Sequence, residues 1–211
     1  RDAEELVASL ARLGVPSRHA GRDVVLDRDS FFGLLALTGA TPPGLLSLHS
    51  SPRLAIYAKS SDSGVKYYFA AVVHGLWRSV LGVVHGKSGA VVCHSKDYGV
   101  ISELARAVKE EVVGGRPRGI RIHRSANIYA LSIGRKAVVR LFKEALAKAP
   151  VRPVVVREDG SVALDGVGIL KKDSNYIKVN NVEDLLTLYK SLKSAGYSAT
   201  LYPDGVKIGK K

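Results

Sequence analysis

Residues 53–95 read RLAIYAKSSDSGVKYYFAAVVHGLWRSVLGVVHGKSGAVVCHS, and their pattern predicts the main sheet of the protein. It holds four apolar segments, and the turn residues Asp-Ser-Gly, His-Gly and Gly-Lys-Ser-Gly separate them. Short apolar segments bounded by such turns are typical of strands. The stretch therefore predicts an antiparallel meander with strands at 53–61, 65–73, 76–84 and 90–95.

The first two strands of the meander predict a sheet with two different faces. Apolar side chains alternate with basic and aromatic ones, so one face is apolar and the other is mixed, as in a half-exposed sheet. A face of cations and aromatic rings can contact phosphates and stack on bases, although an ordinary solvated face has the same composition. The residues that this interpretation assigns to nucleic acid are Arg53, Tyr57, Lys59, Lys66 and Tyr68.

Three units on either side of the meander share one pattern. Amphipathic helices are predicted at 3–14, 98–115 and 182–196, and each ends on glycine and is followed by two short strands. Hairpin turns are expected at 20–22 and 203–205. Repeated helix-plus-hairpin units predict an α+β fold in which antiparallel sheets pack with helices.

Positive charge is concentrated between residues 112 and 157. This segment holds eleven Arg or Lys and a single acid, Glu144, which gives a local net charge of +10 out of +13 for the whole chain. Self-repulsion destabilises a compact state that keeps so many like charges together. A polyanion that neutralises them is the simplest explanation, because each phosphate contact releases condensed counterions. A solvated basic face kept for solubility is the alternative.

Two elements of this segment are the expected phosphate contacts. One is the basic hairpin after the second predicted helix, and the other is a helix over 135–149 whose cations recur at i, i+4 and i+7 with apolar residues on the opposite side. The residues assigned to nucleic acid are Arg116, Arg118, Arg121, Arg124, Lys136, Arg140 and Lys143.

The composition limits the classes of protein to which this chain can belong. A hydrophobic content of 46% suffices for a core, and no apolar run approaches the roughly 20 residues of a membrane span. The one cysteine, Cys93, excludes an internal disulfide and a Cys-based zinc finger, and a reducing cytoplasm is expected. The scarcity of thermolabile residues resembles that of hyperthermophile proteins. Because the sequence opens on Arg1 and holds no Met, it also has the look of a fragment or processed chain.

The string FFGLLALTGATPPG (31–44) predicts a buried helix that Asp29 or Ser30 caps and that ends at Gly39 before two prolines. Its first nine residues also resemble the LAGLIDADG motif of homing endonucleases. In that family the two glycines allow paired helices to pack closely, and the acid before the last glycine binds the catalytic metal. The resemblance implies a close helix contact at Gly33 and DNA-binding topology. Thr38 occupies the motif position of the metal-binding acid. A neutral hydroxyl does not supply the anionic oxygen that a hard cation needs, so cleavage is not expected.

A broader resemblance covers nearly the whole chain. The strings at 29–45, 67–80 and 182–208 are similar, in the same order, to the paralogous-repeat protein family of hyperthermophilic crenarchaea. This resemblance implies a lineage-expanded gene family and carries no catalytic residues. The region 85–125 departs most from the family's pattern.

Other catalytic signatures are incomplete. The segment 82–88 resembles a phosphate-binding loop but is one residue short and leads into a predicted strand. His74, His85 and His94 lie in or beside the meander without a nearby carboxylate, so they are interpreted as surface or turn histidines rather than metal ligands. No metal and no cofactor is expected.

These observations predict a nucleic-acid-binding α+β protein with a LAGLIDADG-like arrangement. We expect an N-terminal lobe at 1–149 and a C-terminal lobe at 150–211, or one continuous domain. Double-stranded DNA is favoured over RNA by the family resemblance alone, no membrane partner is expected, and an oligomer is possible. Two alternatives remain open: a metal-dependent endonuclease, and a protein-interaction module of a longer chain. The acids that the nuclease alternative would use are Asp23, Asp27 and Asp29.

Overall fold

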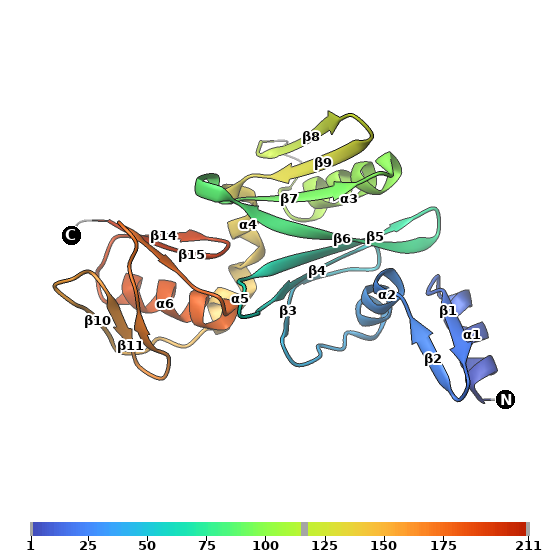
Figure 1. Ribbon diagram of the computed structural model, residues 1–211, viewed down its shortest axis with the longest axis horizontal. Helices are drawn as coiled ribbons and strands as arrows, with labels where there is room; N and C mark the ends of the chain where they lie inside the picture. Colours follow the sequence, from blue (N-terminus) through green and yellow to red (C-terminus); the bar gives the residue numbers. More distant parts are fainter. Residues whose placement is uncertain (1, 115–117, 210–211) are drawn as a thin grey trace.

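A seven-stranded antiparallel sheet forms the centre of the computed structural model, which describes residues 2–114 and 118–209 (Figure 1). The predicted meander is confirmed, since four of its strands are consecutive neighbours. The sequence did not reveal the edge strand β3, whose pairing with β4 is interrupted by an irregularity between Ser47 and His49. In spatial order the strands are β3 (Leu45–Ser50), β4 (Leu54–Lys59), β5 (Lys66–Val73), β6 (Leu76–His85), β7 (Ala90–Ser95), β9 (Ile128–Ile133) and β8 (Ile120–Ser125), with a 3-10 turn η1 (Gly86–Ser88) between β6 and β7.

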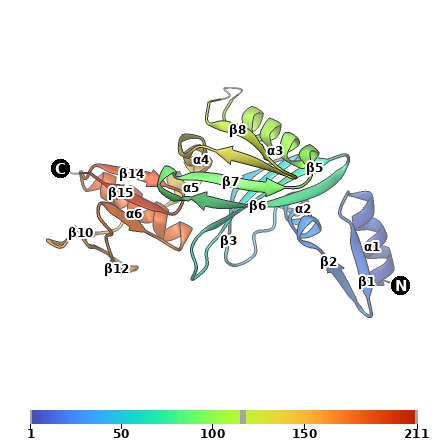
Figure 2. The same cartoon turned by 45° about the horizontal axis from the view of Figure 1, so that its top comes forward.

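The two faces of this sheet are covered differently. Helices α3 (Tyr98–Glu111) and α4 (Arg135–Leu141) pack on one face and close the main hydrophobic core, which includes Ile56, Phe69 and Leu131 (Figure 2). Helix α2 (Arg28–Thr38) packs on the other face over β4, β5 and β6, with a smaller core around Tyr57 and Trp77. Strands β4 and β5 are thus buried on both faces over most of their length, with Lys59 and Lys66 exposed at one end.

Helix α2 forms over the predicted segment, but its cap and its partner differ from the prediction. The side chain of Asp27, rather than Asp29 or Ser30, accepts the Ser30 backbone N–H at 2.8 Å, and the helix ends at Gly39 in the left-handed region. A Cβ at Gly33 would lie 2.6 Å from Cγ of Trp77. The close contact predicted at Gly33 therefore exists, but its partner is a strand side chain rather than a second helix.

The three predicted helix-plus-hairpin units are present. They are α1 (Asp2–Arg12) with β1 (Ser17–Ala20) and β2 (Asp23–Leu26), α3 with β8 and β9, and α6 (Val182–Ser194) with β14 (Ala199–Tyr202) and β15 (Gly205–Ile208). The hairpins have different surroundings: β1–β2 is a separate two-stranded sheet, β8–β9 extends the central sheet, and β14–β15 pairs with β13 (Tyr176–Lys178). Together these elements confirm an α+β fold of antiparallel sheets packed with helices.

The C-terminal part carries a second three-stranded sheet of β10 (Val154–Val156), β11 (Val162–Leu164) and β12 (Gly168–Leu170). The helix predicted over 135–149 is divided into α4 and α5 (Lys143–Lys148) at Phe142, whose side chain is fully buried. The main core contains residues from both sides of position 150, Leu131 and Leu185 among them. The buried hydroxyl of Tyr67 also donates to the carbonyl of Pro203, which links the central sheet to the C-terminal hairpin.

Candidate nucleic-acid interface

The second face of the central sheet is uncovered beyond α2. Strand register places Lys59 opposite Lys66, and farther across the sheet it places Val83 opposite Val92, Val92 opposite Ser132 and Ser132 opposite Arg121. Since Tyr67 pairs with Gly82, Lys66 lies in line with Val83. One transverse row thus joins cations that are more than fifty residues apart in sequence. We call this surface the open face: Lys59, Lys66, Val83, His85, Val92, His94, Arg121, His123 and Ser132.

The open face has one sign of charge. None of the seven strands, all of which lie in the described part of the chain, contains an Asp or Glu. The side chains of Lys59, Lys66 and Arg121 are exposed and take part in no ion pair among the described residues. A cationic sheet surface without acids on its strands attracts anions through its summed field.

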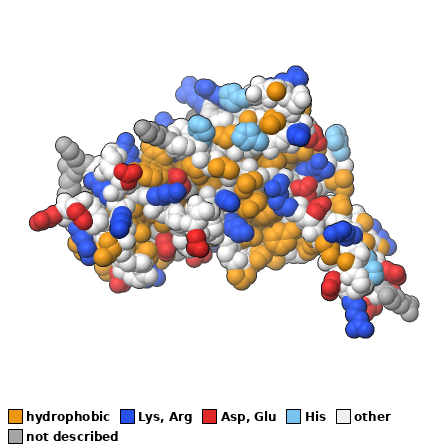
Figure 3. Space-filling view, in the orientation of Figure 1, with side chains coloured by type: hydrophobic (Ala, Val, Ile, Leu, Met, Phe, Trp, Pro, Cys, Tyr) orange, Lys and Arg blue, Asp and Glu red, His pale blue; other side chains and the backbone are white. Residues whose placement is uncertain are grey.

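A shallow hollow of about 560 Å³ lies on the open face. Its floor is apolar, with Val83 and Val92, and three imidazoles surround it, from His85, His94 and His123. Figure 3 shows histidine side chains grouped among apolar ones over the part of the sheet that holds β7, β9 and β8. His74 does not join them, because it lies in the β5–β6 turn with a positive φ of 50°. His123 was not singled out by sequence, since it comes near His94 only through the pairing of β9 with both β7 and β8, which places Ala130 between the two histidines.

A second hollow of about 320 Å³ lies between α2 and the edge of the sheet. Arg28, Phe31, Lys59 and Tyr68 are among the side chains that line it. The ring of Tyr68 stacks on Phe32 with centroids 4.8 Å apart, so the tyrosine is half-buried and supports the hollow's wall. This hollow adds aromatic surface and a further cation beside the Lys59 end of the open face.

The assignment of Tyr57 to the exposed face is wrong. Its side chain is 1% exposed and contacts Phe32, with ring centroids 5.5 Å apart. Burial raises the pKa of the Tyr57 hydroxyl. Alternation placed Tyr57 correctly on the second face, but α2 covers that part of the face.

Two acids of α3 hold the guanidinium of Arg53, another residue of the predicted strand 53–61 that was assigned to phosphate contact. Its Nε donates to Glu111 at 2.9 Å, and Nη2 forms an ion pair with Glu110. Glu111 also bonds His49 at 2.7 Å and accepts from the hydroxyl of Ser51. Burial raises the pKa of Glu111, but the hydrogen bonds from His49, Arg53 and Ser51 outweigh it, and the net effect lowers that pKa.

The arginine side chains of the basic hairpin lie on different faces of the sheet. Arg121 lies on the open face, whereas Arg124, three residues later, lies on the other face with its guanidinium over the ring of Tyr129 at 5.6 Å. Arg118 is exposed ahead of β8, and Arg116 lies outside the described residues. Strand alternation therefore places Arg121 and Arg124 on opposite faces, so these two side chains do not form one surface.

The cations of the predicted basic helix lie away from the open face. Helix α4 packs its apolar side on the α3 side of the sheet. Lys136 and Lys143 are exposed there, while Arg140 donates to the backbone carbonyl of Val113 at 3.1 Å. The charge-rich segment 112–157 is thus distributed over opposite sides of the protein.

The side chains considered for metal chemistry have structural contacts. The Thr38 hydroxyl donates to the carbonyl of Leu34 at 2.8 Å, Asp27 caps α2, and Asp29 accepts from the backbone and hydroxyl of Ser79. Asp23 is exposed in the β1–β2 hairpin. The described residues contain no group of three or more His, Cys, Asp or Glu side chains that could hold a metal ion.

Comparison of the chain with protein-family models, with curated proteins and with solved structures finds no match. Among residues 2–114 and 118–209, no helix combines the length and the apolar character that crossing a membrane requires.

Proposed function

We propose that the protein binds nucleic acid through the open face, without cleaving it. The single observation that supports this proposal is the transverse row of Lys59, Lys66 and Arg121 on strands that carry no acid. Neutralisation of phosphates by such cations releases counterions and stabilises the complex.

The spacing of the cations suits a duplex. Lys66 on β5 and Arg121 on β8 are separated by four strand-to-strand steps, about 19 Å at roughly 4.8 Å each. This span exceeds the roughly 12 Å width of the major groove, so the two side chains can reach phosphates on opposite rims while Ser132 and the histidines between them face the bases. The preference for DNA over RNA rests on the LAGLIDADG resemblance.

The absence of cleavage in this proposal rests on the side chains that a metal-dependent nuclease site would need. Hydrolysis with one or two metal ions needs carboxylates that hold the cation and its nucleophilic water. Thr38 is neutral, and Asp27 and Asp29 accept hydrogen bonds that stabilise α2 and its contact with β6. These acids therefore serve the fold in this proposal.

The test is fluorescence anisotropy with labelled duplex DNA, single-stranded DNA and RNA at two salt concentrations. The variant K66A/R121A should weaken binding at least tenfold and reduce the salt dependence by roughly two phosphate contacts. The matched control K136A/K143A removes the same charge from the opposite side of the protein and should have a much smaller effect. Equal loss in the two variants would show that net charge, rather than the open face, carries the binding.

An acidic protein partner is the competing explanation for the basic surface. The same titration separates the two, because a surface for an acidic protein predicts only weak, salt-sensitive nucleic-acid binding that K66A/R121A and K136A/K143A reduce to the same extent.

A further inference from the structure

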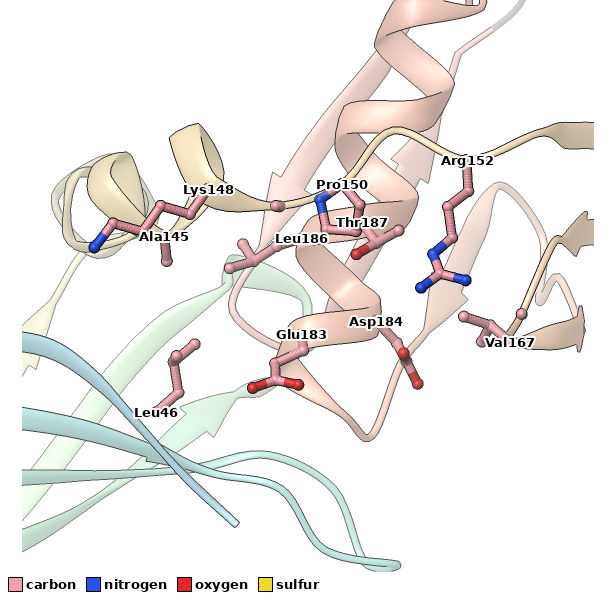
Figure 4. A pocket seen from close by; sticks show the side chains of 12 residues that line it. Leu46, Ala145, Lys148, Pro150, Arg152, Val167, Glu183, Asp184, Leu186 and Thr187 are labelled. Atoms are coloured by element: carbon pink, nitrogen blue, oxygen red, sulfur yellow. The ribbon is translucent and has the colours of Figure 1, made fainter. Parts of the chain in front are cut away.

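A cleft of about 300 Å³ lies between the first turns of α6, the segment that follows α5, and the β11–β12 turn (Figure 4). It is separate from the open face and does not depend on the proposed function. Its apolar walls are formed by Leu46, Ala145, Pro150, Val167 and Leu186.

One hydroxyl that opens on this cleft has no protein hydrogen-bond partner. Thr187 is 5% exposed as a residue and lines the cleft one helical turn after Glu183. Within residues 2–114 and 118–209, no group bonds its hydroxyl, which Figure 4 shows beside Leu186. Its oxygen is not among the described side-chain atoms that are shut off from solvent without a partner, so it is accessible from the cleft and available to a ligand.

Two charged groups face each other near this hydroxyl without forming an ion pair. The side chain of Arg152 lies against Gly166, where a Cβ would come within 2.1 Å of Nη1, and its backbone N–H donates to the Ser191 hydroxyl at 2.9 Å. Across from it, Asp184 carries a carboxylate that is partly withdrawn from water (Figure 4). Burial raises the pKa of Asp184, and the positive charge of Arg152 offsets this only in part.

The helix alone explains part of this arrangement. Acids in a first turn stabilise the positive end of the helix dipole, which accounts for Glu183 and Asp184. The dipole does not account for the unbonded hydroxyl of Thr187 or for a guanidinium held within reach of Asp184 but not paired with it. Those two features indicate a site that a polar ligand completes.

We propose that this cleft binds a free α-amino acid with an apolar side chain. The ligand's ammonium group donates to the Asp184 carboxylate and to the Thr187 hydroxyl, and its carboxylate accepts from Arg152. Its side chain then contacts Leu46 and Leu186.

This ligand class matches the charges of the cleft. An α-amino acid carries its ammonium and carboxylate on one carbon, so it can fill a gap between adjacent, opposite charges. An anion without an amine would be repelled by Asp184, and a cation without a carboxylate would be repelled by Arg152. A volume near 300 Å³ is large enough for one apolar amino acid and lies at the small end of ligand pockets.

The probe is L-leucine, tested by calorimetry and by methyl NMR of the full chain, with Leu46, Val167 and Leu186 as reporters. We expect saturable binding below about 10 mM, with shifts at these three methyl-bearing residues. Isocaproate lacks the amine and isoamylamine lacks the carboxylate, so each should bind at least tenfold more weakly than leucine. Absence of saturable leucine binding, or equal binding of isocaproate, would overturn the proposal.

Three substitutions test the roles of the polar groups. D184N, R152A and T187V should each reduce leucine affinity, D184N and R152A by tenfold or more, with unchanged circular dichroism. T187V keeps the shape of the side chain and should melt close to the wild-type temperature, because the hydroxyl that it removes faces the cleft and makes no hydrogen bond within the described fold. The control R157A removes an exposed arginine from the neighbouring β10–β11 turn and should bind leucine normally. Wild-type affinity in D184N and R152A would show that leucine binds elsewhere.

Discussion

The contact between Gly33 of α2 and Trp77 of β6 predicts a measurable cost for a single added methyl group. In G33A, the new Cβ would lie 2.6 Å from Cγ, 2.7 Å from Cβ and 2.8 Å from Cδ1 of Trp77. Carbon atoms pack best at about 3.5–4.0 Å, so the overlap is roughly 1 Å. Rotation of the indole cannot relieve this overlap, because the close atoms lie at the base of the side chain, next to the backbone. The Trp77 side chain is also only 3% exposed, so it has no free space to move into.

The magnitude follows from two opposing terms. Overpacking of a tight core costs about 1–3 kcal/mol. Replacement of glycine by alanine inside a helix stabilises it by up to about 1 kcal/mol. We therefore expect G33A to lower the free energy of unfolding by about 1–2 kcal/mol, which corresponds to a melting temperature lower by roughly 2–8 °C for a chain of this size.

Thermal and denaturant unfolding of wild type, G33A, W77A and G33A/W77A tests this reasoning. In the W77A background two of the three close atoms, Cγ and Cδ1, are absent, so the added methyl group should cost much less, and the cycle should show a coupling energy of about 1 kcal/mol or more. A G33A protein that is as stable as wild type, or more stable, would refute the argument, because helix propensity would then act alone.

Three further predictions concern other contacts. Because the pKa of Glu111 is lowered in the folded protein, its ionised form stabilises the fold above the usual pKa of 4.5, and this contribution is lost as the pH falls below that value. In E111Q the free energy of unfolding should therefore depend less on pH in that range, and an unchanged pH dependence would contradict this. Y67F removes the buried hydroxyl that donates to Pro203 and should destabilise by about 1 kcal/mol in urea unfolding, whereas unaltered stability would show that this bond is dispensable. Incubation of duplex DNA with the protein and Mg²⁺ or Mn²⁺ should give no cleavage on gels; metal-dependent cutting that D27N or D29N abolishes would establish the nuclease alternative.

Sequence patterns alone predicted the four strands of the meander and several helices of this protein. Apolar segments bounded by turn residues over 53–95 placed four strands, and amphipathic patterns that end on glycine placed α1, α3 and α6. Alternation also assigned Tyr57 and Lys59 to the same face. These signals are local, because the direction of a side chain depends only on its own backbone and that of its neighbours.

Which of those side chains can contact a ligand depends on how distant elements pack together. Tyr57 and Lys59 share a face, but α2 covers the tyrosine and leaves the lysine exposed. Arg53 is neutralised by Glu110 and Glu111, which follow it by nearly sixty residues. The reason is that burial and ion pairing depend on which distant elements pack together, and periodicity within one segment carries no information on that choice.

The alignment of cations across the sheet also depends on which distant strands pair. Lys66 and Arg121 lie in one row because four successive pairings align β5, β6, β7, β9 and β8. The dense charge of 112–157 suggested a single basic surface, whereas the β8–β9 hairpin and α4 place its cations on opposite sides of the sheet. Charge along a chain is a property of sequence, but the field at a surface is a sum over side chains that only folding brings together.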